Sequence, residues 1–408
     1  MQNPNKNQTL YLFTDKFPYK GGEPFLETEI HYLSKAFDKV IIYPLTGHGA
    51  ELVEVPKNVK VRNFNTNQPV YLRKLLLKHG WVISKWFLIE FVKSPHRFKY
   101  ITQFRWNFKR LVGLLNNAAL FKTLNSKLTT QHSTFYSYWF NDWASILSLA
   151  KQLGLNGKFV SRTHGFDFDE QQQGRGCHPF RHVELPKFDK VFQVSEYGQN
   201  YISKRFPRAE NIEVSKLGVT NKGTNPISKD KLFQIVSCSN FVPLKRVDLI
   251  VEILSHLSIP FHWIHFGAGS GMEKVQAKAE NLLNKDSFTF KCFVPNKDIM
   301  EWYKTNAVDL FINVSELEGL PVSLMEAISF GIPVVGCNVC GVPEIVTKNT
   351  GVLLEVDFKP NVVAFQLQDF YEKKARNIEF RNDVKAFWAV NFDANINYKA
   401  FVSKMLES

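Results

Sequence analysis

Short runs rich in β-branched and aromatic residues recur along the chain, and a stretch with helical character follows each of them. The first half holds five such runs, at Thr9–Thr14, Lys39–Pro44, Phe135–Phe140, Lys158–Arg162 and Lys190–Ser195. The second half holds five more, at Gln234–Ser239, His262–Gly267, Phe288–Val294, Asp309–Ser315 and Pro333–Cys337. Alternation of strand, loop and helix predicts parallel sheets with helices on both faces. The pattern therefore predicts an α/β fold.

A polar stretch, Asn221–Lys231, is rich in turn-forming residues and lacks apolar periodicity, so we expect a linker there. It divides the chain into two Rossmann-like domains, predicted at residues 1–225 and 226–385. The last segment, 386–408, has helical character, and we expect it to pack back on the N-terminal domain. Ligands of open α/β sheets bind beyond the carboxyl ends of the strands, so two such domains are expected to face a central cleft.

The composition supports two folded domains and argues against several classes of protein. A chain of 408 residues is too long for one ordinary domain, and an apolar fraction of 44% allows sizeable cores. We find no uncharged apolar run of about 18 residues and no pattern of a secretory signal. The five cysteines are few and odd in number, which favours a reducing compartment over a disulfide framework. We therefore expect a cytoplasmic protein.

Most of the formal charge of +13 is concentrated in residues 73–127, which contain twelve Lys or Arg and a single acid, Glu90. Aromatic residues such as Trp81 and Phe91 lie between the basic ones. This mixture suits an anionic membrane surface, which predicts a peripheral location on the inner face of the cell membrane. Amphipathic helices with a solvated basic face explain it equally well. Nucleic acid is less favoured as a partner, because no nucleic-acid motif accompanies the segment.

The most informative segment, Ser315–Val346, reads SELEGLPVSLMEAISFGIPVVGCNVCGVPEIV. Its proline and glycine signals predict a helix over Pro321–Phe330. The amino end of that helix offers N–H groups and a dipole that favour a phosphate. Glu318 lies in the preceding loop and Glu326 eight residues later, at most about 12 Å away along a helix. That separation suits two parts of one extended ligand better than one reacting bond.

Glu318 and Glu326 form an E-x7-E pattern flanked by GLP, MEA, GIPVV and GVPEIV. Together these residues resemble the donor-binding segment of retaining glycosyltransferases with the GT-B fold, most closely those of family 4 (glycosyl transferases group 1). The resemblance implies that Glu318 hydrogen-bonds hydroxyls of the donor sugar at the catalytic centre. It implies that Glu326 binds the ribose hydroxyls of the nucleotide, and that Gly319 and Leu320 lie at the donor, Gly319 through its backbone amide.

Other parts of the predicted second domain resemble the same family. Lys245, in IVSCSNFVPLKRVDLI, aligns with a lysine that binds the donor diphosphate, a role that suits a point charge. Where the family commonly has Arg and Gly, this chain has Asn240 and Arg246, and we expect Arg246 to compensate by binding the diphosphate. The resemblance also implies that backbone groups near Val294 contact the nucleotide base.

The predicted first domain has three matching segments. In FPYKGGEPFLETEI, Gly21 and Gly22 are expected to let the backbone approach the donor phosphates closely. The segment SRTHGFDFDE resembles the strand-end His-Gly segment of the family. This resemblance implies that His164 touches the donor sugar at the reacting centre, with Asp167 nearby. The third segment, FYSYWFNDWA, resembles a strand-end motif of some of these enzymes, and core aromatics explain it equally well.

No metal ion or cofactor is expected, apart from the nucleotide sugar that serves as donor substrate. Cys337-x-x-Cys340 has the spacing of a zinc or redox pair, but no second pair accompanies it. The Asp-x-Asp pattern of metal-dependent transferases occurs only at Asp167–Asp169, which we interpret as part of the His-Gly segment.

The sequence thus predicts a retaining, hexosyltransferase-type glycosyltransferase that moves a sugar from a nucleoside diphosphate sugar to an acceptor hydroxyl. A glycan or lipid-linked acceptor of lipopolysaccharide, capsule or other surface glycan synthesis fits the family. Two alternatives stay open: another GT-B enzyme, such as a sugar-nucleotide epimerase or a phosphorylase, and a non-catalytic relative that binds membranes or polyanions. Asn240 and Cys292, which depart from the family pattern, keep the second alternative open. A glycosidase is less favoured, because its two carboxylates must flank one bond.

Overall fold

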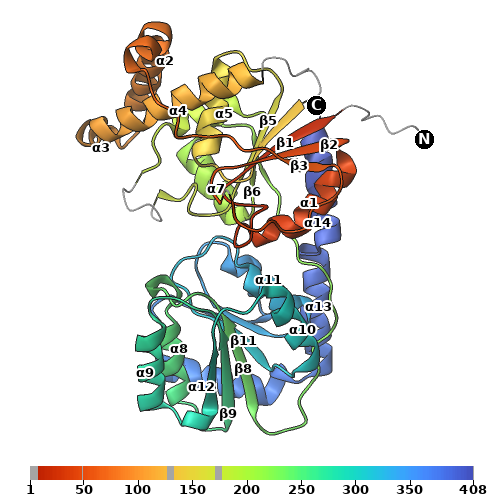
Figure 1. Cartoon of the computed structure of the whole chain (residues 1–408). Helices are drawn as coiled ribbons and strands as arrows, with labels where there is room; N and C mark the ends of the chain where they lie inside the picture. Colours follow the sequence, from red (N-terminus) through yellow and green to blue (C-terminus); the bar gives the residue numbers. More distant parts are fainter. Residues whose placement is uncertain (1–7, 48, 126–132, 171–176, 408) are drawn as a thin grey trace. The chain divides into compact units, whose positions relative to one another are not determined.

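The computed structural model describes residues 8–47, 49–125, 133–170 and 177–407 (Figure 1). Lys127, at the end of the expected basic segment, lies outside the described residues. The chain forms two units. The N-terminal unit comprises Met1–Ser215 and Tyr398–Ser408, and the C-terminal unit comprises Lys216–Asn397.

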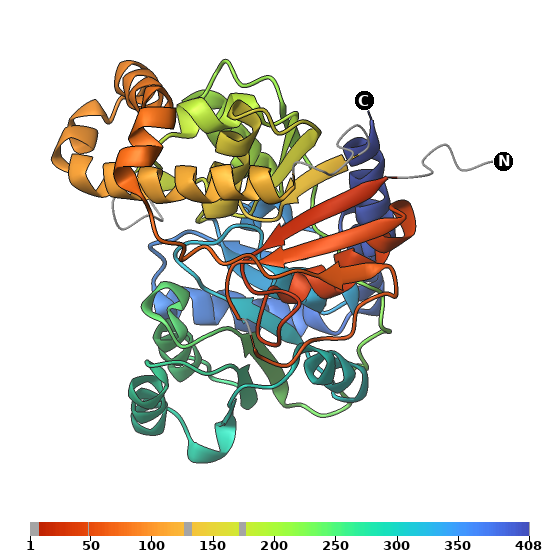
Figure 2. The same cartoon turned by 45° about the horizontal axis from the view of Figure 1, so that its top comes forward.

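The N-terminal unit is built on a seven-stranded parallel sheet with strand order β3-β2-β1-β4-β5-β6-β7. Its strands are β1 Thr9–Thr14, β2 Lys39–Pro44, β3 Val59–Val61, β4 Ser133–Ser137, β5 Lys158–Thr163, β6 Lys190–Gln193 and β7 Ile212–Val214. Its helices are α1 Pro24–Ala36, α2 Leu72–Lys93, α3 Arg97–Thr102, α4 Phe104–Leu124, α5 Asp142–Gln152, α6 Arg181–Glu184 and α7 Glu196–Arg205. Figure 2 shows the first strands side by side in this sheet.

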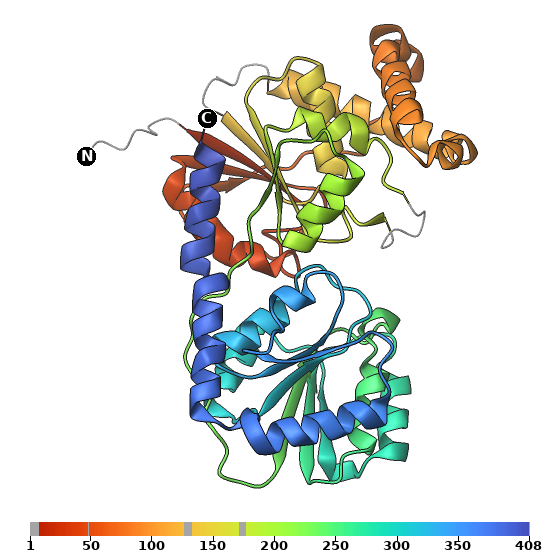
Figure 3. The same cartoon turned by 180° about the vertical axis from the view of Figure 1, so that it is seen from behind.

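Alternate residues of β1 face opposite sides of the sheet, as the period of a strand requires. Tyr11 and Phe13 belong to one core, which α2, α4 and α5 cover, and Leu10 and Leu12 belong to another, which α1 covers. Phe401, near the end of the chain, is fully buried in the second core. The end of the chain therefore completes one face of the N-terminal sheet (Figure 3).

The C-terminal unit is built on a six-stranded parallel sheet with order β10-β9-β8-β11-β12-β13. Its strands are β8 Phe233–Cys238, β9 Phe261–Phe266, β10 Phe288–Lys291, β11 Leu310–Asn313, β12 Val334–Cys337 and β13 Gly351–Leu354. Its helices are α8 Val247–Ser255, α9 Met272–Leu282, α10 Asn296–Thr305, α11 Val322–Ser329, α12 Pro360–Phe370 and α13 Ile378–Asn391. The last helix, α14 (Ala394–Leu406), begins in this unit and ends in the other.

The predicted α/β fold with two Rossmann-like units is confirmed, and the ten predicted strands correspond to ten of the observed ones. The sequence reading missed β3, β7 and β13, three- or four-residue strands at sheet edges, because so short a run shows no clear alternation. It also placed the strand β4 late, at Phe135–Phe140 rather than Ser133–Ser137. The predicted helix Pro321–Phe330 is α11, with Pro321 at its N-cap.

The observed division of the chain differs from the predicted one at residue 225. The structure assigns residues from Lys216 onward to the C-terminal unit, and Asn225 shows why. Its amide donates to the carbonyl of Tyr303 at 2.6 Å and its side-chain oxygen accepts from the amide of Val308 at 2.9 Å. The polar stretch expected to be a linker is therefore fastened to the C-terminal unit. The chain rejoins the N-terminal unit at Tyr398, later than the predicted residue 386.

Among the residues that the structure describes, no helix is both long and apolar enough to cross a membrane.

Candidate functional site

Two neighbouring strands of the C-terminal sheet bring a lysine and a glutamate together. Lys245 closes a short 3-10 turn after β8, and Glu318 lies in the loop between β11 and α11. Because β8 and β11 are adjacent, their carboxyl ends meet, and Lys245 Nζ donates to Glu318 Oε1 at 2.6 Å. Asn313, the last residue of β11, donates to the same oxygen at 3.1 Å.

The Lys245–Glu318 pair remains accessible to a ligand. The side chain of Lys245 is 24% exposed and that of Glu318 is 10% exposed. The amide of Glu316 donates to the carbonyl of Leu244 at 3.0 Å, which fixes the loop against the turn. Within the described residues no side chain caps α11, so the amide groups of its first turn are also open to an anion.

Glu326 lies on α11, and its Oε1 accepts from Asn296 Nδ2 at 2.7 Å. Burial raises the pKa of Glu326 to about 7, although the Asn296 amide and the Lys222 ammonium act to lower it. Burial and the Glu326 carboxylate together raise the pKa of the nearby Cys238 thiol to about 12. Glu326 is therefore a half-buried carboxylate that accepts a hydrogen bond from a side chain of α10.

Arg246, expected to bind the diphosphate, has internal hydrogen-bond partners in the structure. Its guanidinium donates to the carbonyl oxygens of Val314 at 2.7 Å and Val356 at 3.0 Å, and to Cys337 Sγ at 3.2 Å. It also lies 5.5 Å from the ring centroid of Phe358. These contacts hold Arg246 inside the unit, where it joins the end of β12 to the loops after β11 and β13. Lys245, in contrast, has a single side-chain partner in the part of the chain that the structure describes, Glu318.

The other donor-side candidates lie in the loops around this pair. The carbonyl of Gly319 accepts from the amide of Gly341 at 3.0 Å, which fixes the loop to the segment after β12. Leu320 is buried, and Val294 is half-buried in the loop between β10 and α10. The loop with Val294 leads into α10, and Asn296, the first residue of α10, contacts Glu326 on α11.

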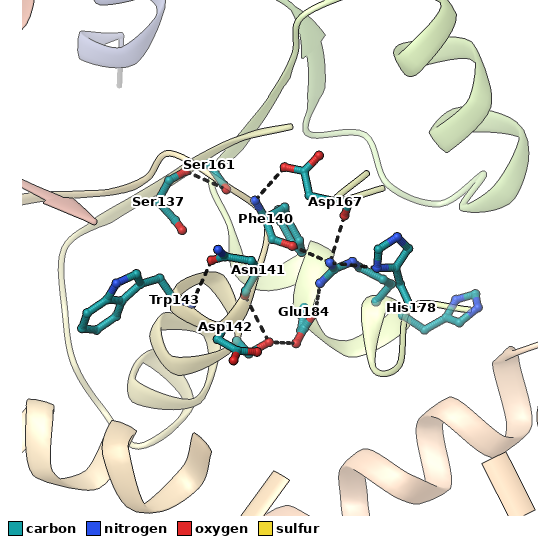
Figure 4. Close-up of polar contacts among 12 residues, drawn as sticks. Ser137, Phe140, Asn141, Asp142, Trp143, Ser161, Asp167, His178 and Glu184 are labelled. Atoms are coloured by element: carbon teal, nitrogen blue, oxygen red, sulfur yellow. Dashed lines mark hydrogen bonds and ion pairs between the residues drawn. The ribbon is translucent and has the colours of Figure 1, made fainter. Parts of the chain in front are cut away.

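In the N-terminal unit, Asp167 organises the ends of β4 and β5 (Figure 4). Its carboxylate accepts from the backbone amides of His164 at 2.8 Å, Gly165 at 3.0 Å and Phe140 at 3.0 Å. Burial alone would raise the pKa of Asp167, but the approach of His164 and these hydrogen bonds hold it below its usual value. Asp167 thus shapes the strand-end loops.

The ring of His164 lies among aromatic side chains, with centroids 4.5 Å from Tyr138 and 4.3 Å from Trp139. Its side chain is only 7% exposed, and Nδ1 is 3.9 Å from Asp167 Oδ2. Within the described residues neither ring nitrogen has a hydrogen-bond partner. Burial lowers the pKa of His164, so the imidazole is neutral near pH 7 and keeps its hydrogen-bonding capacity for another group.

The Gly21–Gly22 turn folds tightly on the loop after β1. Gly21 has a φ of +74°, and a Cβ on Gly22 would lie 2.6 Å from the amide nitrogen of Phe17. The next residue, Glu23, accepts from the backbone amides of Asp15 at 2.6 Å and Phe17 at 2.6 Å and from Trp139 Nε1 at 3.0 Å. The carboxylate of Glu23 therefore binds the backbone amides of Asp15, Lys16 and Phe17, and the amide of Gly22 donates to the carbonyl of Tyr19.

No cluster of three or more His, Cys, Asp or Glu within the described ranges is placed to hold a metal ion.

A family model matches the segment that contains the Lys245–Glu318 pair. Residues 221–387 match the family model Glycosyl transferases group 1. This glycosyl transferases group 1 segment lies within the C-terminal unit and contains Lys245, Glu318 and Glu326.

Relatives of known name match about half of the chain. WcaL of Escherichia coli (strain K12), provisionally named a colanic acid biosynthesis glycosyltransferase, is 25% identical over 207 residues, covering 48% of this chain and 51% of that protein. The amylovoran biosynthesis glycosyltransferase AmsK of Erwinia amylovora is 26% identical over 212 residues, covering 48% and 50%. The chain thus spans about half the length of these curated relatives.

Solved structures establish the fold over nearly the whole chain. The crystal structure of Anabaena HepE in complex with UDP matches with a TM-score of 0.69 and 16% sequence identity, covering 98% of this chain and 99% of that one. The chain therefore has the GT-B fold, built from two parallel-sheet α/β units.

The structure brings some of the predicted residues together and gives others a different setting. Lys245 and Glu318 are in direct contact, and Glu326 lies on the helix that follows Glu318, whereas Arg246 is held by internal partners. Sequence reasoning missed Asn313 and Asn296, which hold the two glutamates. Asn313 lies at the end of a strand and Asn296 at the start of a helix. A polar residue at such a junction is a signal by which a site residue can be found. Glu23 was missed as well, although it directly precedes the proline that begins α1.

Proposed function

We propose that this protein is a retaining glycosyltransferase that moves a sugar from a nucleoside diphosphate sugar to an acceptor hydroxyl. The observation that carries the proposal is the contact of Lys245 with Glu318 beside the start of α11. The carboxyl ends of two strands here bring together a cation, a carboxylate and an uncapped helix end. This combination suits a ligand that is anionic at one end and rich in hydroxyls at the other. The match of residues 221–387 to the glycosyl transferases group 1 supports the same reading.

Lys245 is the proposed ligand of the diphosphate. In the absence of donor its ammonium is paired with Glu318, and both side chains are partly exposed. Because neither side chain is fully buried, the ammonium can turn toward a diphosphate, which then replaces the carboxylate as its anionic partner. The N-terminal end of α11, equivalent to about half a positive charge, adds to the attraction.

The two glutamates take the hydroxyl-bearing parts of the donor in this proposal. Glu318, released from Lys245, accepts hydrogen bonds from hydroxyls of the sugar, and Glu326 accepts them from the ribose. The spacing of eight residues separates the two carboxylates as an extended ligand requires. Gly319 and Leu320, between them in sequence, and backbone groups near Val294 contact the donor.

The reaction breaks the bond between the anomeric carbon and the diphosphate oxygen and forms a bond from that carbon to the acceptor oxygen. Negative charge develops on the leaving diphosphate, where Lys245 and the start of α11 stabilise it through a fixed electrostatic arrangement. The acceptor proton passes to the leaving phosphate oxygen, and attack on the same face retains the anomeric configuration. This scheme requires neither a protein nucleophile nor a metal ion. That His164 touches the donor sugar stays a prediction, which turnover of His164→Ala tests.

The proposed acceptor is a hydroxyl of a surface glycan or of its lipid-linked precursor. The names of the relatives, which refer to colanic acid and amylovoran biosynthesis, support this class, and the sugar is expected to be a hexose.

The test is a product assay with nucleoside diphosphate sugars and glycan acceptors. We expect release of nucleoside diphosphate only when an acceptor is supplied, and nuclear magnetic resonance should show the donor's anomeric configuration in the product. Inversion of that configuration would contradict retention. An altered sugar formed without an acceptor would favour an epimerase, and consumption of inorganic phosphate a phosphorylase. No turnover and no donor binding would favour a non-catalytic relative.

A further inference from the structure

The helix α2 presents apolar side chains on two opposite faces. Its inner face, with Val82 and Trp86, is buried in the N-terminal unit. On its outer face Leu77 is 82% exposed, Leu88 is 64% exposed and Trp81 is 56% exposed. Residues 77, 81 and 88 are four and seven positions apart, so they share one side of the helix. Exposing several large apolar side chains on one helix face to water is unfavourable, so such a face indicates contact with another surface.

The exposed apolar surface continues beyond α2. In α3, Phe98 is 73% exposed and Ile101 is 57% exposed, and Phe104 and Trp106 at the start of α4 are also exposed. Figures 1 and 2 show α2, α3 and the start of α4 together beside the sheet of the N-terminal unit. We call the exposed residues of α2, α3 and the first turns of α4, residues 72–109, the α2–α4 surface.

The α2–α4 surface is strongly basic. Lys74, Lys78 and Lys85 flank the apolar stripe on α2, and Arg97 and Lys99 lie on α3, all of them exposed. The one acid among residues 72–109, Glu90, lies beneath this surface: it is buried and accepts from the Tyr100 hydroxyl at 2.9 Å. Burial raises the pKa of Glu90 to about 8, so near pH 7 this carboxyl does not offset the positive charge.

The α2–α4 surface is fixed to the rest of its unit. Trp86 Nε1 donates to Gln152 of α5 at 2.8 Å, Arg110 pairs with Asp142 at 2.6 Å, and the Phe87 ring packs on Phe180. The exposed stripe is therefore held as a preformed face, not a loose segment.

We infer that the α2–α4 surface docks the protein on an anionic phospholipid bilayer. Leucine and aromatic side chains on a helix face can enter the boundary between headgroups and acyl chains, while flanking Lys and Arg contact anionic headgroups. Single-strand nucleic-acid binders combine basic grooves with aromatic platforms. Exposed aliphatic side chains such as Leu77, Leu88 and Ile101 offer no platform for base stacking, so the composition favours lipid over nucleic acid.

The experiment is flotation of the full chain with vesicles of phosphatidylcholine alone or mixed with phosphatidylglycerol. Wild type should float only with the anionic vesicles and should be released as salt shortens the screening length from about 10 Å at 0.1 M to about 3 Å at 1 M. The triple variant Lys74→Gln, Lys78→Gln, Lys85→Gln should partition roughly a hundred-fold less, because each cation near the surface contributes about fivefold.

A substitution of an apolar residue tests the apolar contribution of the α2–α4 surface. Trp81→Ala should reduce partitioning roughly tenfold, since burying a large apolar side chain contributes about that much. The matched controls lie in the C-terminal unit: Phe365→Ala, at a side chain 75% exposed, and the triple variant Lys229→Gln, Lys285→Gln, Lys359→Gln at exposed lysines. Both controls should bind vesicles as wild type does. All altered side chains are exposed, so thermal unfolding should be unchanged and misfolding is readily detected.

Three results would overturn the inference. One is the absence of flotation with anionic vesicles, and another is equal loss of binding in the control variants. The third is a protein that does not bind lipid but uses this surface for another partner. Binding of a single-stranded oligonucleotide, or self-association that Trp81→Ala abolishes, would show this. None of these results depends on donor binding, so the proposed transferase activity is tested separately.

Discussion

The carboxyl ends of the two sheets carry charged side chains in opposite settings. In the N-terminal unit Arg181 donates to Glu184 at 2.5 Å and to the carbonyls of Phe140 and Asp167, and Glu184 also accepts from Ser145 at 2.5 Å. These groups are buried. In the C-terminal unit the charges of the candidate site are partly exposed and have few side-chain partners, as Lys245 and Glu318 show.

This difference separates charges that build the fold from charges that can serve a ligand. A buried charge with several fixed partners is costly to remove and cannot turn to a new ligand. A partly exposed pair contributes little to stability and can exchange one partner for another. In the N-terminal unit strand-end charges thus hold loop structure, whereas in the C-terminal unit Lys245 and Glu318 can still exchange partners.

The largest expected effect is on stability in the N-terminal unit. Arg181→Met should lower the free energy of unfolding by about 3–5 kcal/mol, because Glu184 is left buried without its cationic partner. Urea denaturation measures this change in the free energy of unfolding. The double variant Arg181→Met, Glu184→Gln should recover part of the loss. A change below about 1 kcal/mol for Arg181→Met would show that these charges do not support the fold.

Next in size is the loss of turnover expected for Lys245→Ala. Removing a cation from the leaving diphosphate should lower turnover about 10²–10³-fold, equivalent to about 2.7–4 kcal/mol. The free energy of unfolding should change by less than about 1 kcal/mol. Lys278→Ala is the matched control, since Lys278 is 28% exposed and paired with Glu252 in the same unit, and it should keep wild-type turnover. Equal turnover in the two variants would remove the distinction between binding and structural charges.

Arg246 should behave as a structural charge although it lies next to Lys245. Its φ of +46° is a conformation that glycine adopts more readily, and its side chain compensates with three internal hydrogen bonds. Arg246→Ala should lower the free energy of unfolding by about 1–3 kcal/mol. Arg246→Gly should be more stable than Arg246→Ala by about 1 kcal/mol, because the left-handed strain is relieved. A fall in turnover as large as that of Lys245→Ala, with both proteins folded, would restore the phosphate role to Arg246.

The last prediction concerns the pH dependence that Glu326 introduces. Its pKa of about 7 lies above the usual 4.5, so the folded state favours the protonated form. The stabilising contribution is full below about pH 4.5 and is lost as the pH rises through about 7. Binding of the ribose hydroxyls has the opposite pH dependence, because it requires the ionised carboxylate. Donor affinity should therefore fall by up to about tenfold per pH unit below 7.

Glu326→Gln separates these two trends. The variant should unfold at a higher temperature than wild type above about pH 8 and at a similar one near pH 4.5. Its donor affinity should be low and independent of pH between about 5 and 8. Calorimetric titration of the donor across that range gives the affinity, and an unchanged pH profile in Glu326→Gln would reject the ribose assignment.

Much of the fold and part of the site were predictable from the sequence, for reasons that lie in particular residues. The central strand β1 has a continuous apolar run over Leu10–Phe13, and Pro321 and Gly331 delimit α11, so local signals sufficed. Glu318 and Lys245 lie at strand ends, where the parallel sheet itself brings them together.

The remainder depended on tertiary contacts that no local pattern encodes. Arg246 could be interpreted as a phosphate ligand because its acceptors, the carbonyls of Val314 and Val356, lie far away in the sequence. The edge strand β7 is defined by its pairing with β6 and not by its own three residues. The contact of the Glu23 carboxylate with the amides of Asp15 and Phe17 depends on the fold of the intervening turn, which the sequence alone does not reveal.

The central claim is that the charges at the carboxyl edge of the C-terminal sheet are available for a donor diphosphate. Calorimetric titration with uridine, guanosine, adenosine and cytidine diphosphates, against wild type, Lys245→Ala and Lys278→Ala, tests it most directly. We predict that at least one of these diphosphates binds wild type and Lys278→Ala equally, and that Lys245→Ala binds it at least about tenfold more weakly. Failure of all four to bind wild type, or equal affinity in Lys245→Ala, would contradict the claim.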